Sequence, residues 1–245
     1  MEIVGEVFAW LTDPANWTGA DGIPTRMQEH VVLSVVSLLI GLAIALPLGL
    51  AIGHTGRGAG AVVAIANVGR AVPSVGILGI AFTLTLPLVA ALDLRNIGTP
   101  AALIALIALA IPPIVVNAYT GIRDVDADTV EAARGMGMKE RQVLRRVEWP
   151  LALPVVLAGV RTASVQVIAT ATLGAILSTG GLGRYIVDGF ARQDYPMMVG
   201  GALLVMILTL TSEGLFAVGQ RRSVSPGLRT GLARHLAEPA PGFGL

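Results

Sequence analysis

Three charged residues lie inside long apolar stretches, where a charge needs a chemical reason. Arg70, Arg161 and Glu213 are each the only charged residue in an apolar run. A charge at the centre of a bilayer is costly, so such groups pair, face water or serve a function. Arg161 lies eleven residues after Pro150, and Glu213 lies eight before Arg221, which places both at a similar depth. They could form an ion pair that locks one conformation, or each could reach water alone.

The chain lacks the residue groupings of the common catalytic and metal sites. It has no cysteine, which excludes disulfides, thiolate ligands and a cysteine nucleophile. Its histidines, His30, His54 and His235, lie far apart, without the i, i+4 spacing that binds zinc on a helix. There is no G-x-x-x-x-G-K-[ST] motif for ATP, and no basic stripe with aromatics for nucleic acid. We therefore expect no catalytic residue, no metal and no cofactor.

Composition and hydropathy indicate a protein that lies in a bilayer. Of its 245 residues, 54% are hydrophobic and 13% are charged, which is about half the charged share of a globular domain. Five apolar runs reach the roughly 20 residues that a membrane-spanning helix needs. Pro73 and Pro87 predict a kinked or broken second span, and a glycine-rich turn at 178–183 ends the fourth. The predicted fold class is an all-α membrane protein with about five transmembrane helices, over residues 31–53, 59–92, 100–122, 151–183 and 195–220.

The basic residues predict the orientation of these spans. If the loop between the third and fourth spans lies inside, 11 of the 17 Lys and Arg face the inner side and 4 face the outer side. This bias favours an outer N-terminus and a cytoplasmic C-terminus in the inner (plasma) membrane. Residues 1–30 would then be an extracytoplasmic segment with a short interfacial helix, residues 31–220 the membrane domain, and residues 221–245 a disordered cytoplasmic tail.

The loop at residues 124–150 is the only sizeable polar segment between spans. Residues Asp128–Glu131 resemble a capping box, with the first as the cap and the last reaching back. Gly135 and Gly137 permit the positive φ of a sharp turn, and a second amphipathic helix resumes near Lys139. We expect a helix–turn–helix whose small apolar surface fits a partner; the alternative is a plain connection between two spans.

Glu131-Ala132-Ala133 is followed after three residues by Gly137, and after nine more by Val147-Glu148-Trp149-Pro150. This spacing resembles the EAA motif of ATP-binding-cassette (ABC) importer permeases, which reads E-A-A, three residues, G, nine residues, I, one residue, L-P. Valine replaces the isoleucine here and tryptophan the leucine. The resemblance implies the MetI-like importer-permease fold. It also implies that the loop couples a separate ATPase subunit to the spans through Glu131, Ala132, Ala133, Gly135 and Gly137.

Other segments extend this likeness over residues 30–220: residues 131–138, 146–154, 158–163 and 180–183, and Pro73-Ser74. They resemble the osmoprotectant branch of these permeases, whose members import glycine betaine, choline, carnitine or related compatible solutes. Asn67 and Arg70 share a helix face that either lines a path or contacts another subunit, and Ser74 is a third candidate for the path. Arg70 departs from the branch, where an uncharged polar residue is more usual, and a cation there would alter the path for a cationic substrate.

The resemblance also implies partners. They are an ABC ATPase subunit, an extracytoplasmic solute-binding protein and a second permease subunit (an identical copy or a paralogue), all held within membrane lipid. Two other functions stay open. One is a permease of the same architecture for another small solute, such as an amino acid, which the ligand of the binding protein would reveal. The other is an ATP-independent channel or carrier, which would not co-purify with an ATPase.

Overall fold

The computed structural model describes residues 2–91 and 98–223, and these residues form helices and no strand. Five of the helices are long and apolar enough to cross a membrane, which confirms the predicted fold class. The elements are α1 (Glu2–Thr12), a 3-10 turn (Pro14–Trp17), α2 (Ile23–Thr55), α3 (Ala59–Ala71), α4 (Ser74–Ala91), α5 (Gly98–Arg123), α6 (Ala127–Gly135), α7 (Glu140–Val143), a π-helical turn (Leu144–Glu148), α8 (Trp149–Thr170), a 3-10 segment (Ala171–Leu177), α9 (Gly183–Arg192) and α10 (Tyr195–Ser223).

One span boundary differs from the expected one. The first span starts at Ile23, eight residues earlier than predicted. The polar residues at its start are accommodated because Arg26 Nη1 contacts Glu29 Oε2 at 2.8 Å. The predicted break of the second span is confirmed at Pro73, where α3 ends and α4 begins, whereas α4 continues through Pro87. The predicted tail lies mostly outside the described residues.

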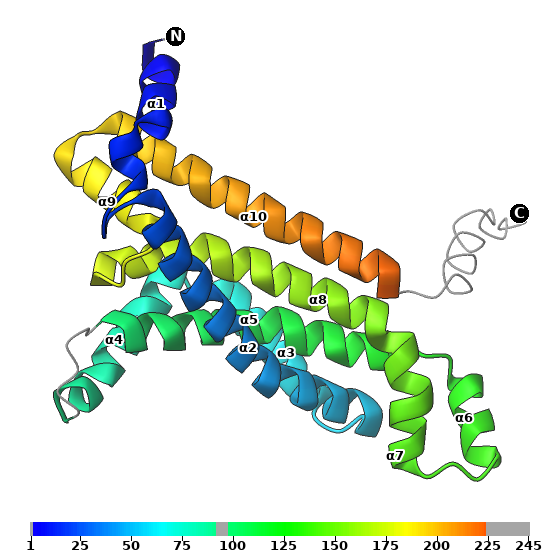
Figure 1. Cartoon of the computed structure of the whole chain (residues 1–245). Helices are drawn as coiled ribbons and strands as arrows, with labels where there is room; N and C mark the ends of the chain where they lie inside the picture. The colour runs from blue at the N-terminus through cyan, green and yellow to red at the C-terminus, as the bar shows by residue number, and fades with distance from the viewer. Residues whose placement is uncertain (1, 92–97, 224–245) are drawn as a thin grey trace, which may run out of the picture.

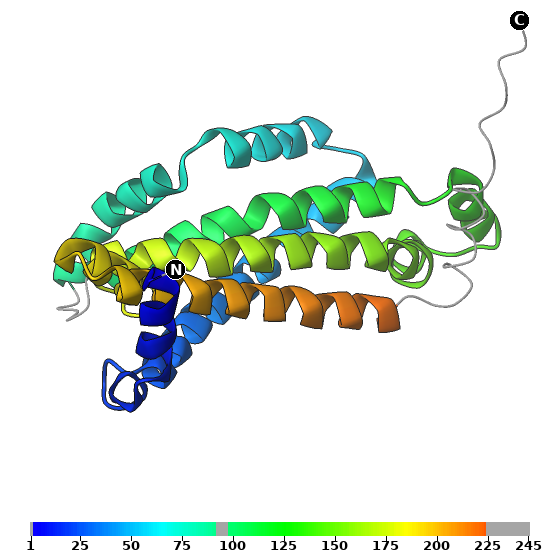
Figure 2. The ribbon, with the colours of Figure 1, turned by 90° about the horizontal axis from the view of Figure 1, so that it is seen from above.

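The long helices form a layered bundle. Figure 1 shows α5, α8 and α10 running roughly along one another, with α2 crossing α5. Seen from above, α3 and α4 form an arch along the far side of α5 (Figure 2). The helices α6 and α7 extend beyond one end of the bundle, and α1 and α9 lie at the other end (Figure 1). The loop and the N-terminal helix are therefore on opposite sides of the bundle.

The C-terminal half of α2 packs closely on α5 through small residues. Gly41, Ala45, Gly49 and Gly53 recur every four residues and are buried. A Cβ on Gly49 would lie 2.6 Å from the Cβ of Ala118, and one on Gly53 would lie 2.8 Å from the Cβ of Ile122, so neither position has room for a side chain. Small residues at this spacing let two membrane helices approach to backbone contact. The two helices are therefore in close contact at this end.

The helix α1 crosses the opposite end of the bundle. Trp10 packs edge-on against Tyr185 of α9 with ring centroids 5.2 Å apart. The Tyr185 hydroxyl donates to the carbonyl of Asp21 at 2.6 Å, and burial raises the pKa of Tyr185 to about 12. Val4 and Phe8 on the free side of α1 are 70% and 68% exposed. This arrangement suits a helix at a membrane interface, which stays a prediction.

Candidate functional site

The loop between α5 and α8 begins with a capped helix, but not at the expected cap. The carboxylate of Asp126 accepts hydrogen bonds from the backbone N–H groups of Asp128 at 2.7 Å and Thr129 at 3.1 Å. The predicted capping box at Asp128–Glu131 is therefore wrong by two residues, because Asp126 already satisfies the free N–H groups. Asp128 lies in the first turn instead, where its charge still faces the positive end of the helix.

The turn that ends α6 depends on Gly137. Its φ is +84°, as the sequence predicted, whereas Gly135 keeps an ordinary φ and ends the helix proper. The N–H of Gly137 donates to Arg134 O at 2.9 Å, and the N–H of Met138 donates to Ala133 O at 3.2 Å. This pair of bonds is the Schellman motif, which favours glycine at the left-handed position. The chain then resumes a helix after Lys139, also as predicted.

The helix–turn–helix has a packed underside and an open outer surface. Val130, Ala133 and Val143 are at most 8% exposed and form a small apolar cluster between the two helices. Arg134 closes the turn, because its Nε and Nη2 lie 2.9 and 3.0 Å from the two carboxylate oxygens of Glu140. The outer surface is formed by exposed residues that include Glu131, Ala132, Gly135, Met136 and Gly137. Of the residues that the EAA resemblance implicates, only Ala133 lies beneath this surface.

The base of the loop contacts the end of α2 through a contact that the sequence did not indicate. Glu148 is 4% exposed, and its Oε2 lies 2.5 Å from Nδ1 of His54. The other ring nitrogen of His54 lies 3.2 Å from Oε2 of Glu140. These residues are far apart in sequence, so spacing could not reveal the contact. The available signal was that polar residues stand at the end of one span and at the start of another.

Arg161 on α8 and Glu213 on α10 lie side by side within their spans. Nε of Arg161 is 2.7 Å from Oε1 of Glu213, and Nη2 contacts the same oxygen. Both side chains are about one-third exposed, at 35% and 34%. The structure thus brings together the two membrane charges that could pair. Whether the pair locks one conformation stays a prediction.

A cavity of about 400 Å³ lies between α3, α5 and α8. Asn117 of α5 and Thr162 and Gln166 of α8 supply its polar groups. The Asn117 amide donates to the carbonyl of Pro113 at 2.8 Å, and the Thr162 hydroxyl donates to Ala158 O at 3.0 Å. Asn117 is in the interior of α5, and both α8 residues are in the second half of that helix. Polar side chains at this depth in a span commonly mark a path or binding site. The other lining residues in the described part of the chain are Ala66, Gly69, Pro112, Pro113 and Val116.

Two of the residues predicted to line a path, Asn67 and Ser74, are not among the described residues that line this cavity. Asn67 is exposed on α3, beside the lining residue Ala66. The side chain of Arg70 lies outside the described part of the structure. Ser74 begins α4 and lines a much smaller cavity against α5 and Thr170. Their role stays a prediction, and Asn117, Thr162 and Gln166 are the polar residues that sequence reasoning missed.

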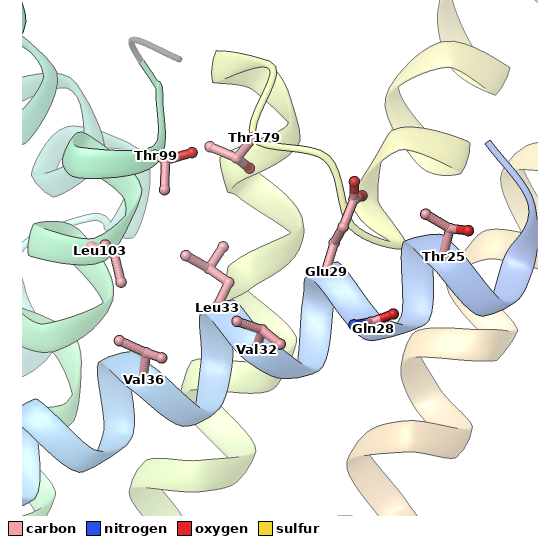
Figure 3. A pocket seen from close by; sticks show the side chains of 9 residues that line it. All are labelled: Thr25, Gln28, Glu29, Val32, Leu33, Val36, Thr99, Leu103 and Thr179. Atoms are coloured by element: carbon pink, nitrogen blue, oxygen red, sulfur yellow. The ribbon is translucent and has the colours of Figure 1, made fainter. Parts of the chain in front are cut away.

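A second cavity, of about 470 Å³, opens near the N-terminal end of α2 (Figure 3). Its carboxylate, Glu29, is already engaged, because Oε2 accepts from the N–H of Gly181 and from Arg26 Nη1, both at 2.8 Å. Val32 and Val36 in its wall are 53% and 38% exposed, so the cavity opens sideways. Polar groups near a membrane surface can contact water, so their presence does not by itself indicate a solute path. The mid-span cavity is therefore the better candidate for a solute path.

Residues 37–229 match the family described as "Binding-protein-dependent transport system inner membrane component". The choline transport system permease protein OpuBB of Bacillus subtilis is 34% identical over 204 residues, which are 83% of this chain and 89% of that protein. The glycine betaine/carnitine/choline permease protein OpuCB of the same organism is 35% identical, with the same coverage. A carnitine transport permease protein OpuCB of Listeria monocytogenes is 36% identical over 192 residues, covering 78% of this chain and 83% of that protein.

Solved structures of ABC transporters share the fold. An inward-facing MetNI methionine transporter aligns with a TM-score of 0.71 at 24% identity, covering 87% of this chain and all of that one. An amino acid ABC transporter aligns with a TM-score of 0.60 at 19% identity, covering 82% and 93%. The predicted resemblance to importer permeases is thus confirmed by sequence relatives and by fold. This chain belongs to the family of inner-membrane components of binding-protein-dependent transport systems.

Proposed function

We propose that this permease subunit carries a compatible solute of the glycine betaine, choline and carnitine type. The observation that supports this most directly is the 34–36% identity to choline, betaine and carnitine permeases over about four-fifths of the chain. The family implies an ATPase partner and a second permease subunit. An extracytoplasmic binding protein delivers the solute, membrane lipid surrounds the complex, and the ATPase partner hydrolyses the ATP.

The loop 124–150 couples the ATPase to the spans. Its exposed surface carries Glu131, Ala132 and Met136 at the free end of a rigid helix–turn–helix, which is a shape that a groove on a partner can receive. Gly135 and Gly137 have no side chains that would project from this surface, and Ala133 packs beneath it. The positive-inside bias of the sequence supports a cytoplasmic location for this end of the bundle and an outer location for α1.

Uptake of labelled solutes tests this function. We expect vesicles containing this chain with its ATPase and binding protein to transport glycine betaine, choline or carnitine. ATP is supplied on the side of the membrane where the ATPase lies. The physical reason is that the spans provide a path and the ATPase supplies the work. Import of an amino acid instead would contradict the solute class, and ATP-independent flux would contradict the importer mechanism.

The mid-span cavity forms part of the solute path in this proposal. Its lining combines neutral hydrogen-bonding groups on Asn117, Thr162 and Gln166 with the apolar surface of Pro112 and Val116. A methylated ammonium has both an apolar shell and a diffuse charge, so a polar, weakly interacting wall lets it pass without trapping it. Such a path needs water contact in the middle of the membrane, and water contact can be measured.

Cysteine reactivity measures it, because the native chain contains no cysteine. We expect Thr162→Cys and Gln166→Cys to react with a thiosulfonate reagent that carries a trimethylammonium group, and added solute to slow the reaction. Leu210→Cys, at a 62% exposed position on α10, is the control. It should react at least about tenfold more slowly, because the reactive thiolate forms only in contact with water. Equal, slow reaction at all three positions would show that lipid or another chain fills the cavity.

A further inference from the structure

The contact between His54 and Glu148 joins two parts of the chain that an importer has to couple. His54 lies next to the last residue of α2, and Glu148 lies in the π-helical turn at the base of the loop. Their side chains are 12% and 6% exposed, and the Nδ1 to Oε2 distance is 2.5 Å. Oε2 of Glu140, the first residue of α7, lies 3.2 Å from the other ring nitrogen of His54. One imidazole thus bridges both ends of the segment that leads from the loop into α8.

The bridge uses both ring nitrogens of His54. A neutral imidazole carries one N–H and can donate to only one carboxylate, whereas an imidazolium donates from both nitrogens. Both ring nitrogens of His54 lie within contact distance of carboxylate oxygens, those of Glu148 and Glu140. Hydrogen bonds between charged groups are shorter and stronger than neutral ones. Glu148 is buried, and without its partner it would be a desolvated charge, which is strongly unfavourable.

The backbone at the base of the loop accounts for the position of Glu148. Pro150 has no N–H to donate, so the α-helical hydrogen-bond ladder cannot run unbroken into α8. The chain passes this point as a π-helical turn over Leu144–Glu148. A π turn contains an extra residue, which rotates the side chains that follow, and such turns are frequent at functional sites. Here the buried Glu148 points at His54 of another span.

Close packing of α2 on α5 connects His54 to the mid-span cavity. His54 directly follows Gly53, where α2 has no room for a Cβ against Ile122 of α5. Asn117, one of the cavity's polar residues, lies on α5 five residues before Ile122. Closely packed elements transmit displacement rather than absorb it. A continuous set of contacts therefore runs from the loop through His54 to a helix that lines the cavity.

We propose that His54 is a positioning residue for transport: it clamps the inner end of α2 to the base of the loop, so that loop movement is passed to α2 and α5. This inference rests on the proposed coupling role of the loop. The clamp acts on the number of solute molecules imported per ATP hydrolysed. A purely structural contact would instead act on the amount of complex assembled.

The test compares His54→Leu and His54→Lys in the complete transporter, reconstituted in vesicles with its ATPase and binding protein. We expect His54→Leu to lower the solute imported per ATP by roughly tenfold, because a buried carboxylate loses its partner. His54→Lys should restore much of the ratio, since an ammonium has three donors for the two carboxylates. Arg57→Leu removes an exposed charge three residues further on and should leave the ratio unchanged.

Glu148→Gln provides a second, independent variant. It should lower the solute imported per ATP, as His54→Leu does. Combining the two variants should lower it little further, because both remove the same contact between His54 and Glu148. An unchanged ratio in His54→Leu and Glu148→Gln, whatever the yield of complex, would overturn the clamp alone. Absence of import by the parent chain would count against the proposed function, and the clamp would fail with it.

Discussion

Replacing Gly137 by valine is expected to lower solute uptake by at least about tenfold. The φ of +84° at Gly137 lies in the left-handed region, where a Cβ costs about 1–2 kcal/mol and a β-branched side chain more. No atom lies within 4 Å of the position that a Cβ would occupy, so the effect would come from the backbone and not from a clash. A strain of about 1.4 kcal/mol corresponds to a tenfold change in an equilibrium constant.

The strain would be relieved by opening the turn, which moves the exposed surface of α6 relative to α7. Labelled glycine betaine uptake and co-purification of the ATPase measure the result, and both should fall together. Gly60→Val is the matched control, because Gly60 also has open space around it but keeps an ordinary φ. Normal uptake by Gly137→Val at normal abundance would show that the turn is not needed for coupling.

Separating Arg161 from Glu213 is expected to have the second large effect. Arg161→Leu leaves a carboxylate inside a membrane span without its cation, and Glu213→Leu leaves the guanidinium. Either change should reduce the folded protein in the membrane roughly fivefold or more, because removing one partner of an ion pair in a weakly polar setting leaves an uncompensated charge. Size-exclusion chromatography of detergent extracts measures the folded fraction, and uptake per folded molecule measures any effect on transport.

Charge reversal distinguishes a specific pair from two separate charges. Arg161→Glu or Glu213→Arg alone brings two like charges together, whereas the double reversal restores an ion pair between α8 and α10. We expect the double variant to recover much of the folded protein lost in the single ones. If it recovers none, the two residues do not depend on each other. Replacement of both by leucine then shows what the pair contributes: recovered abundance with lost uptake would indicate a role in switching conformation.

Hydropathy and one short motif were sufficient for the general architecture. Every backbone N–H and C=O in a bilayer needs an internal partner, so long apolar runs must become helices. Pro73 could be predicted to interrupt a span, because proline has no backbone N–H to donate. The loop could be predicted because its polar residues, its capping signals and the glycine at 137 are local features. The error in the loop was also local, because Asp126 and not Asp128 caps α6. At the other end of the bundle, the paired Arg26 and Glu29 lie within α2 and not before it.

What the sequence could not determine depends on which helices lie next to one another. Arg161 and Glu213 stood out as single charges, yet only the packing of α8 on α10 brings them together. Asn117 and Gln166 looked unremarkable in their apolar runs, because a cavity is formed by facing surfaces of separate helices. Hydropathy cannot distinguish an apolar helix face that contacts lipid from one that contacts another helix, since lipid tails are as apolar as the side chains of a neighbouring helix. The position of His54 between two carboxylates was decided in the same way, by the close glycine packing of α2 on α5 and the π turn before Pro150.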